Sequence, residues 1–108
     1  MSQIITITEE SFDKEVIECD DLVLVDFWAP WCGPCNALTP VIEELARETP
    51  DMKVCKLDVE ANQDFAAKQG IRSIPTLRLY HRGQEVGRHT GTASKQQLIK
   101  FVAENHSA

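Results

Sequence analysis

Two closely spaced cysteines are the residues of this sequence that point most directly to chemistry. Cys32 and Cys35 lie in the segment Trp-Cys-Gly-Pro-Cys, between a strand-like apolar run and a helical pattern. Residues i and i+3 share one face of a helix, so the two sulfur atoms can meet. As the first residue of that helix, Cys32 is expected to face unpaired backbone N–H groups and the positive end of the helix dipole, which favours its thiolate. Cys35 lies one turn further into the helix and is more sheltered. The pair therefore predicts thiol–disulfide exchange in which one thiol is activated and the second reacts in a later step.

The two residues between the cysteines fit this chemistry. Pro34 is tolerated in a first helical turn because the backbone N–H has no intrahelical partner there, and its fixed φ limits the motion that separates the sulfurs. Gly33 has no side chain and leaves room for an incoming chain.

A single carboxylate interrupts the apolar run before the cysteines. Asp26 lies within Leu22–Trp28, which is apolar at odd and even positions alike and is therefore typical of a strand covered on both faces. An ionised carboxylate is expensive to bury, so burial should raise the pKa of Asp26. From the residues alone, the simplest interpretation is a capped or paired structural aspartate.

Hydrophobic periodicity indicates the elements that must position these side chains. Strand patterns occur at 4–7, 22–28, 54–59, 76–80 and 85–89, and helical patterns at 8–20, after Pro34 with an expected kink at Pro40, at 62–69 and around 98–102. Parallel strands joined by helical crossovers, followed by an antiparallel hairpin around Gly83, predict a mixed sheet. We expect a three-layer α/β sandwich with helices on both faces of that sheet.

Length and composition narrow the functional classes. With 108 residues, 43% of them hydrophobic, the chain is expected to form one domain over residues 1–108. The formal net charge of −6 opposes any sequence-independent attraction to nucleic acid or an anionic membrane. No segment has the apolar length of a membrane span and no export signal is recognised, so we expect a cytoplasmic protein.

The remaining cysteines and the histidines give weaker signals. Cys55 falls in a buried strand pattern and is expected to pack as a small hydrophobe, whereas Cys19 lies near a helix end and could oxidise or pair between chains. His81, His89 and His106 could join cysteines around zinc, but no second Cys-x-x-Cys or tight His pair accompanies them. We therefore expect no metal site.

Several motifs, taken in order, are similar to those of the thioredoxin family. They are Val25–Ala29, Trp31–Cys35, Lys56–Asp58, Gly70–Thr76, Gly83 and Gly91. This series is more specific than a lone Cys-x-x-Cys and covers essentially the whole chain. The sequence departs from the common family pattern at Asn36, Gln69 and Thr90, which leaves the reaction class intact but bears on partner preference.

The resemblance implies a fold, a reaction and a supply of electrons. The fold is a central five-stranded mixed sheet flanked by four helices. The reaction is protein disulfide reduction, in which a mixed disulfide forms on Cys32 and is resolved by Cys35. No bound cofactor is implied: a separate enzyme, thioredoxin reductase, supplies the electrons, and a monomer acts on protein disulfide substrates.

The resemblance also implies roles for individual residues. Asp26 would assist proton transfer to and from Cys35, with Lys56 on the neighbouring strand tuning its pKa. The Ile74–Pro75 peptide bond would be cis and lie beside the disulfide, where the Ile74 backbone pairs with an extended substrate segment. The docking surface around Cys32 would comprise Trp31, Gly33, Pro34, Ile74, Pro75 and Gly91.

Two other functions are compatible with parts of the sequence. One is a redox-inert binding subunit with the same fold, but such a subunit needs neither Cys32 nor Cys35. The other is a zinc-binding module, which the single Cys-x-x-Cys disfavours.

Overall fold

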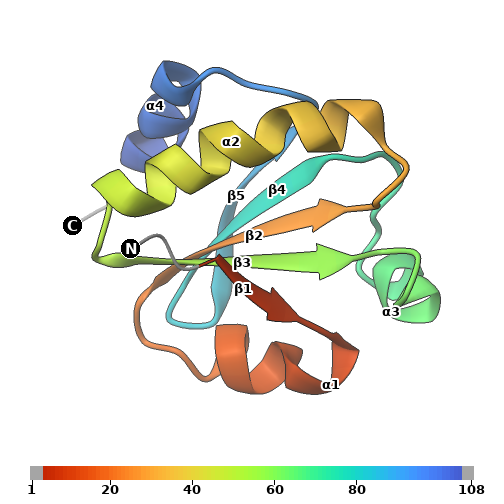
Figure 1. Cartoon of the computed structure of the whole chain (residues 1–108). Coiled ribbons are helices and arrows are strands. Elements are labelled where there is room, and N and C mark those ends of the chain that lie inside the picture. Colours follow the sequence, from red (N-terminus) through yellow and green to blue (C-terminus); the bar gives the residue numbers. More distant parts are fainter. Residues whose placement is uncertain (1–3, 106–108) are drawn as a thin grey trace.

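A five-stranded sheet forms the centre of the computed structural model, which describes residues 4–105 (Figure 1). The strands are β1 (Ile4–Ile7), β2 (Leu22–Trp28), β3 (Met52–Asp58), β4 (Thr76–His81) and β5 (Gln84–Thr90). Their order is β1-β3-β2-β4-β5, with β1, β3 and β2 parallel and β4 and β5 antiparallel to their neighbours. The predicted mixed sheet is confirmed, and β2 is its central strand.

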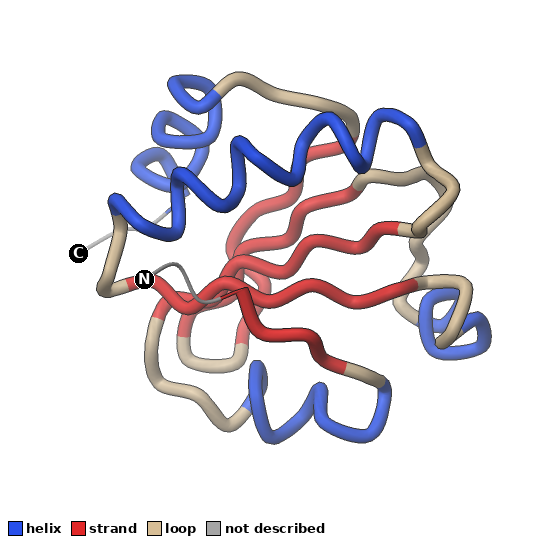
Figure 2. The backbone as a smooth tube through the Cα atoms, viewed as in Figure 1, coloured by secondary structure: helices blue, strands red, loops and turns tan. Residues whose placement is uncertain are grey.

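Two helices cover one face of the sheet (Figures 1 and 2). They are α2 (Gly33–Glu48) and α4 (Lys95–Asn105). Between them and the sheet lies an apolar core to which α2 contributes Leu38, Ile42 and Leu45, and α4 contributes Leu98. Lys95 joins the two helices by ion pairs with Glu44 and Glu48, at 2.7 and 2.9 Å.

The opposite face is covered by the remaining helical segments. These are α1 (Glu9–Phe12), which continues as the π-helical segment η1 (Asp13–Ile17), and α3 (Gln63–Lys68). Their core includes Phe12 and Val16, with Phe65 packed against Phe12 at a ring-centroid distance of 5.0 Å. The predicted three-layer α/β sandwich with helices on both faces is therefore confirmed (Figure 2).

The first helical region is shorter than its sequence pattern predicts. It ends at Ile17 rather than near Asp20, and its second half has π-helical hydrogen bonding. Ile17 does not join the core, since 40% of it is exposed. The backbone at Gly83, in the hairpin loop after β4, approaches the Ile17 carbonyl closely, so the hairpin lies against the end of this helix.

The β4–β5 hairpin closes through a two-residue loop. Arg82 and Gly83 have φ values of 54° and 79°, the left-handed region that suits a tight hairpin with the right-handed twist of its strands. The predicted hairpin is confirmed, and it forms the antiparallel edge of the sheet.

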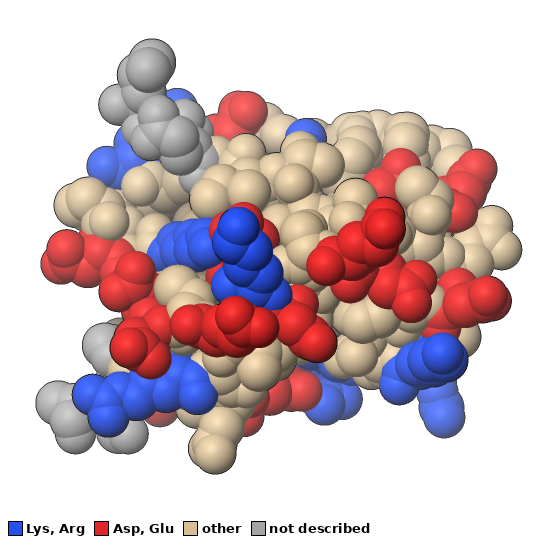
Figure 3. All heavy atoms as spheres, turned by 90° about the horizontal axis from the view of Figure 1, so that it is seen from below, with Lys and Arg blue, Asp and Glu red and all other residues tan. Residues whose placement is uncertain are grey.

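Acidic side chains outnumber basic ones on the surface. Figure 3 views the α1 side of the molecule, where Asp and Glu lie between scattered Lys and Arg side chains. This agrees with 17 acidic against 11 basic residues in the chain. Within residues 4–105, no helix is long and apolar enough to cross a membrane.

Candidate active site

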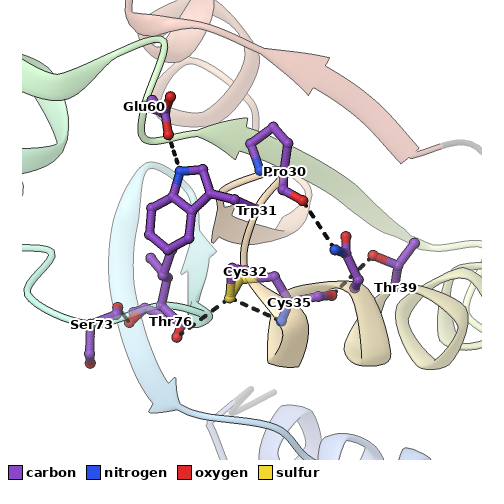
Figure 4. Close-up of a disulfide and its surroundings, with 10 residues drawn as sticks. Pro30, Trp31, Cys32, Cys35, Thr39, Glu60, Ser73 and Thr76 are labelled. Carbon is purple, nitrogen blue, oxygen red and sulfur yellow. Dashed lines mark hydrogen bonds between the residues drawn. A yellow bond between two sulfur atoms is a disulfide. The ribbon is translucent and has the colours of Figure 1, made fainter.

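A disulfide joins Cys32 and Cys35 at the start of α2 (Figure 4). Cys32 is the N-cap of the helix, not its first residue as the sequence pattern suggested, because its backbone is still extended at φ −87° and ψ 110°. The electrostatic setting is as expected, since the backbone N–H of Cys35 donates to Cys32 Sγ at 3.1 Å. An orphan N–H at the positive end of the helix dipole thus points at the sulfur on which a thiolate would form.

The two cysteines differ little in exposure. Cys35 is 1% exposed and Cys32 only 5%, so even the outer sulfur presents a small area to solvent. Ala29 packs against both cysteines, with Trp28 and Ile74 at the edge of this small cluster. A reaction at Cys32 therefore requires a partner that approaches closely from one direction.

The loop before β4 lies beside the disulfide. The Ile74–Pro75 peptide bond is cis, which confirms the prediction from the family resemblance. The carbonyl oxygen of Ile74 lies 3.9 Å from Cys32 Sγ, although 42 residues separate them in the sequence. The N–H of Gly91 donates to the Pro75 carbonyl at 2.8 Å, which brings Gly91 to the same region.

The predicted docking residues surround this point but differ in exposure: Ile74 and Gly91 are half-buried and Pro75 is buried. Trp31 is 69% exposed, and Gly33 and Pro34 are exposed as well. Neither Gly33 nor Gly91 has a neighbouring atom within 4 Å of the position a Cβ would occupy. A cavity of about 280 Å³, lined mainly by apolar groups, includes Trp31 and Ile74 in its wall.

Asp26 is buried, as the sequence predicted. Its exposure is 4%, and burial raises its pKa from 3.8 to about 7 against the opposing charge of Lys56. Lys56 is its register partner on β3, and the Lys56 ammonium lies 4.9 Å from the centre of the Trp28 ring. Within the described chain, Asp26 Oδ1 has no hydrogen-bond partner, and Lys56 supplies the opposite charge that acts on this carboxylate.

The other two cysteines lie outside the site. Cys55 is fully buried in β3 as a free thiol, and burial raises its pKa to about 11. Cys19 is free and half-buried at the edge of the α1-side core. No group of three metal-ligating side chains occurs among residues 4–105, and His106 lies outside the described residues.

Two contacts near the site were not foreseen from the sequence. The Trp31 indole Nε1–H donates to a Glu60 carboxylate oxygen, which fixes the exposed ring (Figure 4). Arg78, within the apolar β4 strand, is only 4% exposed and donates to the backbone carbonyl of Gln69. A cation inside a strand pattern was the available signal for Arg78, whereas nothing in the sequence links Glu60 to Trp31.

The positions that depart from the family pattern have different surroundings. The Asn36 side-chain amide donates to the Pro30 carbonyl at 3.1 Å, at the entrance to α2. Gln69 caps the end of α3, and Thr90 ends β5 opposite Thr76. Of the three, only Asn36 directly follows the reactive pair.

Comparisons with known proteins agree with this geometry. The family model described as "Thioredoxin" matches residues 3–104. The chain is 45% identical over 103 residues to a thioredoxin of Pseudomonas aeruginosa, covering 94% of this chain and 95% of that protein. It is 45% identical over 106 residues to a thioredoxin of Buchnera aphidicola, covering 97% and 98% of the two chains, and 42% identical over 106 residues to one of Haemophilus influenzae, covering 97% and 99%.

A redox-active cysteine pair at a helix start, a five-stranded mixed sheet between helices, and these extended similarities lead to one assignment. The chain belongs to the thioredoxin family and is a thiol–disulfide oxidoreductase that reduces protein disulfides by dithiol–disulfide exchange.

Proposed function

We propose that this protein is a general reductant of protein disulfides, and that a separate thioredoxin reductase returns it to the dithiol form. The observation that carries this proposal is the position of the Cys32–Cys35 pair, which lies at a helix start beside the exposed residues Trp31, Gly33 and Pro34. A redox-inert binding subunit would not need two sulfurs within bonding distance. No bound cofactor enters the scheme, because the two sulfurs hold both electrons of the reaction.

The exchange proceeds in two displacement steps. The Cys32 thiolate attacks one sulfur of the substrate disulfide, so a Cys32–substrate bond forms and the other substrate sulfur leaves as a thiolate. Cys35, as a thiolate, then attacks Cys32 Sγ and releases the second substrate sulfur. Two electrons have passed to the substrate, whose sulfurs take up protons, and the protein is left as the disulfide seen in Figure 4.

The second step needs Cys35 to lose a proton in a buried place. Cys35 is 1% exposed, so water has little direct access to its sulfur. We assign the base to Asp26, because its pKa of about 7 lets it exchange protons near neutral pH. Its alternation with Leu22 and Leu24 along β2 places its side chain on the face that α2 covers. Lys56 supports this role by opposing the effect of burial on the Asp26 pKa.

Substrate docking uses the surface around Cys32. Trp31, Gly33, Pro34 and Gly91 leave an open approach to the sulfur, and cis Pro75 places the Ile74 backbone beside it. An extended segment of the substrate would pair with the Ile74 backbone as a strand pairs with a sheet edge. This contact is sequence-tolerant, which suits a reductant of many proteins.

Three further parts of the proposal concern the working state of the protein. It acts as a monomer, since one chain supplies both sulfurs and all the docking residues. It acts in the cytoplasm, where a dithiol of this kind is kept reduced. Its partners are proteins and neither nucleic acid nor membranes, in keeping with the net charge of −6.

Reduction of insulin disulfides by dithiothreitol tests the central proposal. The wild-type protein should accelerate insulin precipitation, whereas Cys32→Ser should give only the uncatalysed rate. Cys55→Ser is the matched control, because it also removes one sulfur but leaves the reactive pair intact. A wild-type protein no faster than dithiothreitol alone would contradict the proposal. A second assay replaces dithiothreitol with a bacterial thioredoxin reductase and its electron donor, and failure there would contradict only the assigned electron source.

A further inference from the structure

Arg78 is a buried cation that the disulfide exchange does not use. It lies in the middle of β4 between Leu77 and Leu79, and its exposure is 4%. An apolar side chain would pack in this strand without the desolvation penalty that a guanidinium carries. The contacts of Arg78 therefore indicate which role could explain a buried guanidinium at this position.

The strongest of these contacts leads to the end of α3. One guanidinium nitrogen, Nη2, donates to the Gln69 backbone carbonyl at 2.5 Å, and the other, Nη1, lies 3.5 Å from the Gln69 side-chain oxygen. The carboxylate of Glu85 is more distant, at 4.0 Å, and the guanidinium carbon lies 5.6 Å from the Phe27 ring centre. Among the described residues, Arg78 Nε has no partner. The Tyr80 side chain also interacts with the Arg78 guanidinium, but the shortest of these contacts is the one to the Gln69 carbonyl.

Gln69 and Arg78 flank the loop that carries Ile74 and Pro75 of the docking surface. Gln69 is the C-cap of α3, and Arg78 follows two residues after β4 begins at Thr76. Between them lie Ile71 to Ile74, which form one wall of the cavity beside Trp31, and the Ile74 carbonyl next to Cys32 Sγ. The Arg78–Gln69 contact therefore closes the base of this loop.

The other bonds of the loop do not tie α3 to the sheet. Gly70 and Ile71 donate to the Ala67 and Ala66 carbonyls, which lie within α3 itself. The Thr76 hydroxyl donates to the Ser73 carbonyl, which tightens the loop only at its far end. Within residues 62–78, the hydrogen bonds of Arg78 with Gln69 are those that join β4 to the end of α3.

We propose that Arg78 is a positioning residue for the reduction of protein disulfides: by holding the Gln69 carbonyl, it fixes the loop wall against which the substrate docks. This inference rests on the proposed docking surface. Arg78 touches neither sulfur, so its loss should weaken binding of a large substrate and leave the exchange chemistry intact. A small disulfide can reach Cys32 without contacting this wall. Its rate of reduction should therefore not change when Arg78 is replaced.

Steady-state kinetics with two substrates test the proposal. For Arg78→Met, the KM for insulin should rise about three- to tenfold, the effect of losing part of one charge-assisted hydrogen bond, while kcat changes less than about twofold. The rate with 5,5′-dithiobis(2-nitrobenzoate), a small aromatic disulfide, should stay at the wild-type value. Amide hydrogen exchange should be faster at Gly70 and Ile71.

Three variants separate positioning from general stability. Arg78→Lys keeps a buried cation but offers one donor centre instead of two, so its insulin KM should lie between those of wild type and Arg78→Met. Gln69→Ala keeps the backbone carbonyl and should retain a KM close to wild type. Arg88→Met is the matched control, because Arg88 is opposite Arg78 on β5 and also pairs with Glu85, but is 61% exposed.

Several results would overturn the proposal. They are a wild-type insulin KM in Arg78→Met, a proportional loss with both disulfides, or the same KM change in Arg88→Met. If Arg78→Met does not fold, Arg78→Lys provides the test. A wild-type insulin KM and a wild-type rate of amide exchange at Ile71 in Arg78→Lys would also overturn the proposal. A wild-type protein that reduces the small disulfide but not insulin would contradict the proposed function instead.

Discussion

Replacing Asp26 with asparagine should remove a loss of stability that the wild-type protein undergoes as the pH rises. The unfolded carboxyl group ionises near 3.8, whereas burial raises the folded-state pKa to about 7. Between these values the unfolded chain has released the proton and the folded protein keeps it, so the wild-type free energy of unfolding falls with rising pH. A shift of about three units at about 1.4 kcal/mol per unit gives a destabilisation of about 4 kcal/mol above neutral pH.

The change with pH is the sharper measure of this effect. Asparagine does not ionise, so its only constant penalty is the burial of an amide. Between about pH 5 and pH 9, the stability advantage of Asp26→Asn over wild type should grow by about 3 kcal/mol, because about two pH units of that range lie below the folded-state pKa. Most of the increase should occur below about pH 7.

Urea unfolding of the oxidised protein across this pH range provides the assay. Asp64→Asn serves as the control, because it removes one aspartate from an exposed position on α3. In Asp26→Asn, turnover with insulin should slow about tenfold or more if Asp26 moves the Cys35 proton. A constant stability difference at all pH values would refute the raised pKa, and wild-type turnover across the range would refute the catalytic role.

Three further predictions concern other parts of the molecule. Cys35→Ser should accumulate a stable mixed disulfide between Cys32 and the substrate, seen as an added mass that dithiothreitol removes; rapid release of the substrate would contradict the role of Cys35. Leu98→Ala should lower the free energy of unfolding by about 3 kcal/mol because it leaves a cavity under α4, whereas Ile99→Ala, at an exposed position of the same helix, should change it by less than about 0.5 kcal/mol; equal losses would contradict the packing of α4. Iodoacetamide at neutral pH should leave Cys55 unmodified in the folded protein, since burial both shields its thiol and raises its pKa to about 11; mass spectrometry showing rapid labelling would contradict the β3 assignment.

The order of strands and helices followed from local patterns because each pattern reflects its own burial. Leu22–Trp28 is apolar at successive positions since β2 is covered on both faces. Helix ends were harder to predict: the periodicity through Ile17 continued toward Asp20, but the hairpin loop at Gly83 occupies the space next to Ile17. The position at which this helix ends therefore depends on a contact with a loop that is distant in the sequence.

The reactive pair and its carboxylate could be found from the sequence alone. Cys32 and Cys35 are close because three residues span one helical turn, and Asp26 is buried because its own strand is apolar throughout. Both properties are local, so residue type and spacing suffice to determine them.

The surroundings of the pair were decided only by the tertiary structure. The Ile74 carbonyl reaches Cys32 across 42 residues, Glu60 holds Trp31, and Arg78 holds the end of α3 at Gln69. These contacts depend on which strands are neighbours, in what register, and on how each helix lies over the sheet. The separation of residues in the sequence does not determine these distances, because they are set by the packing of strands and helices against one another. The residues that shape the substrate surface can therefore be identified only from the assembled structure.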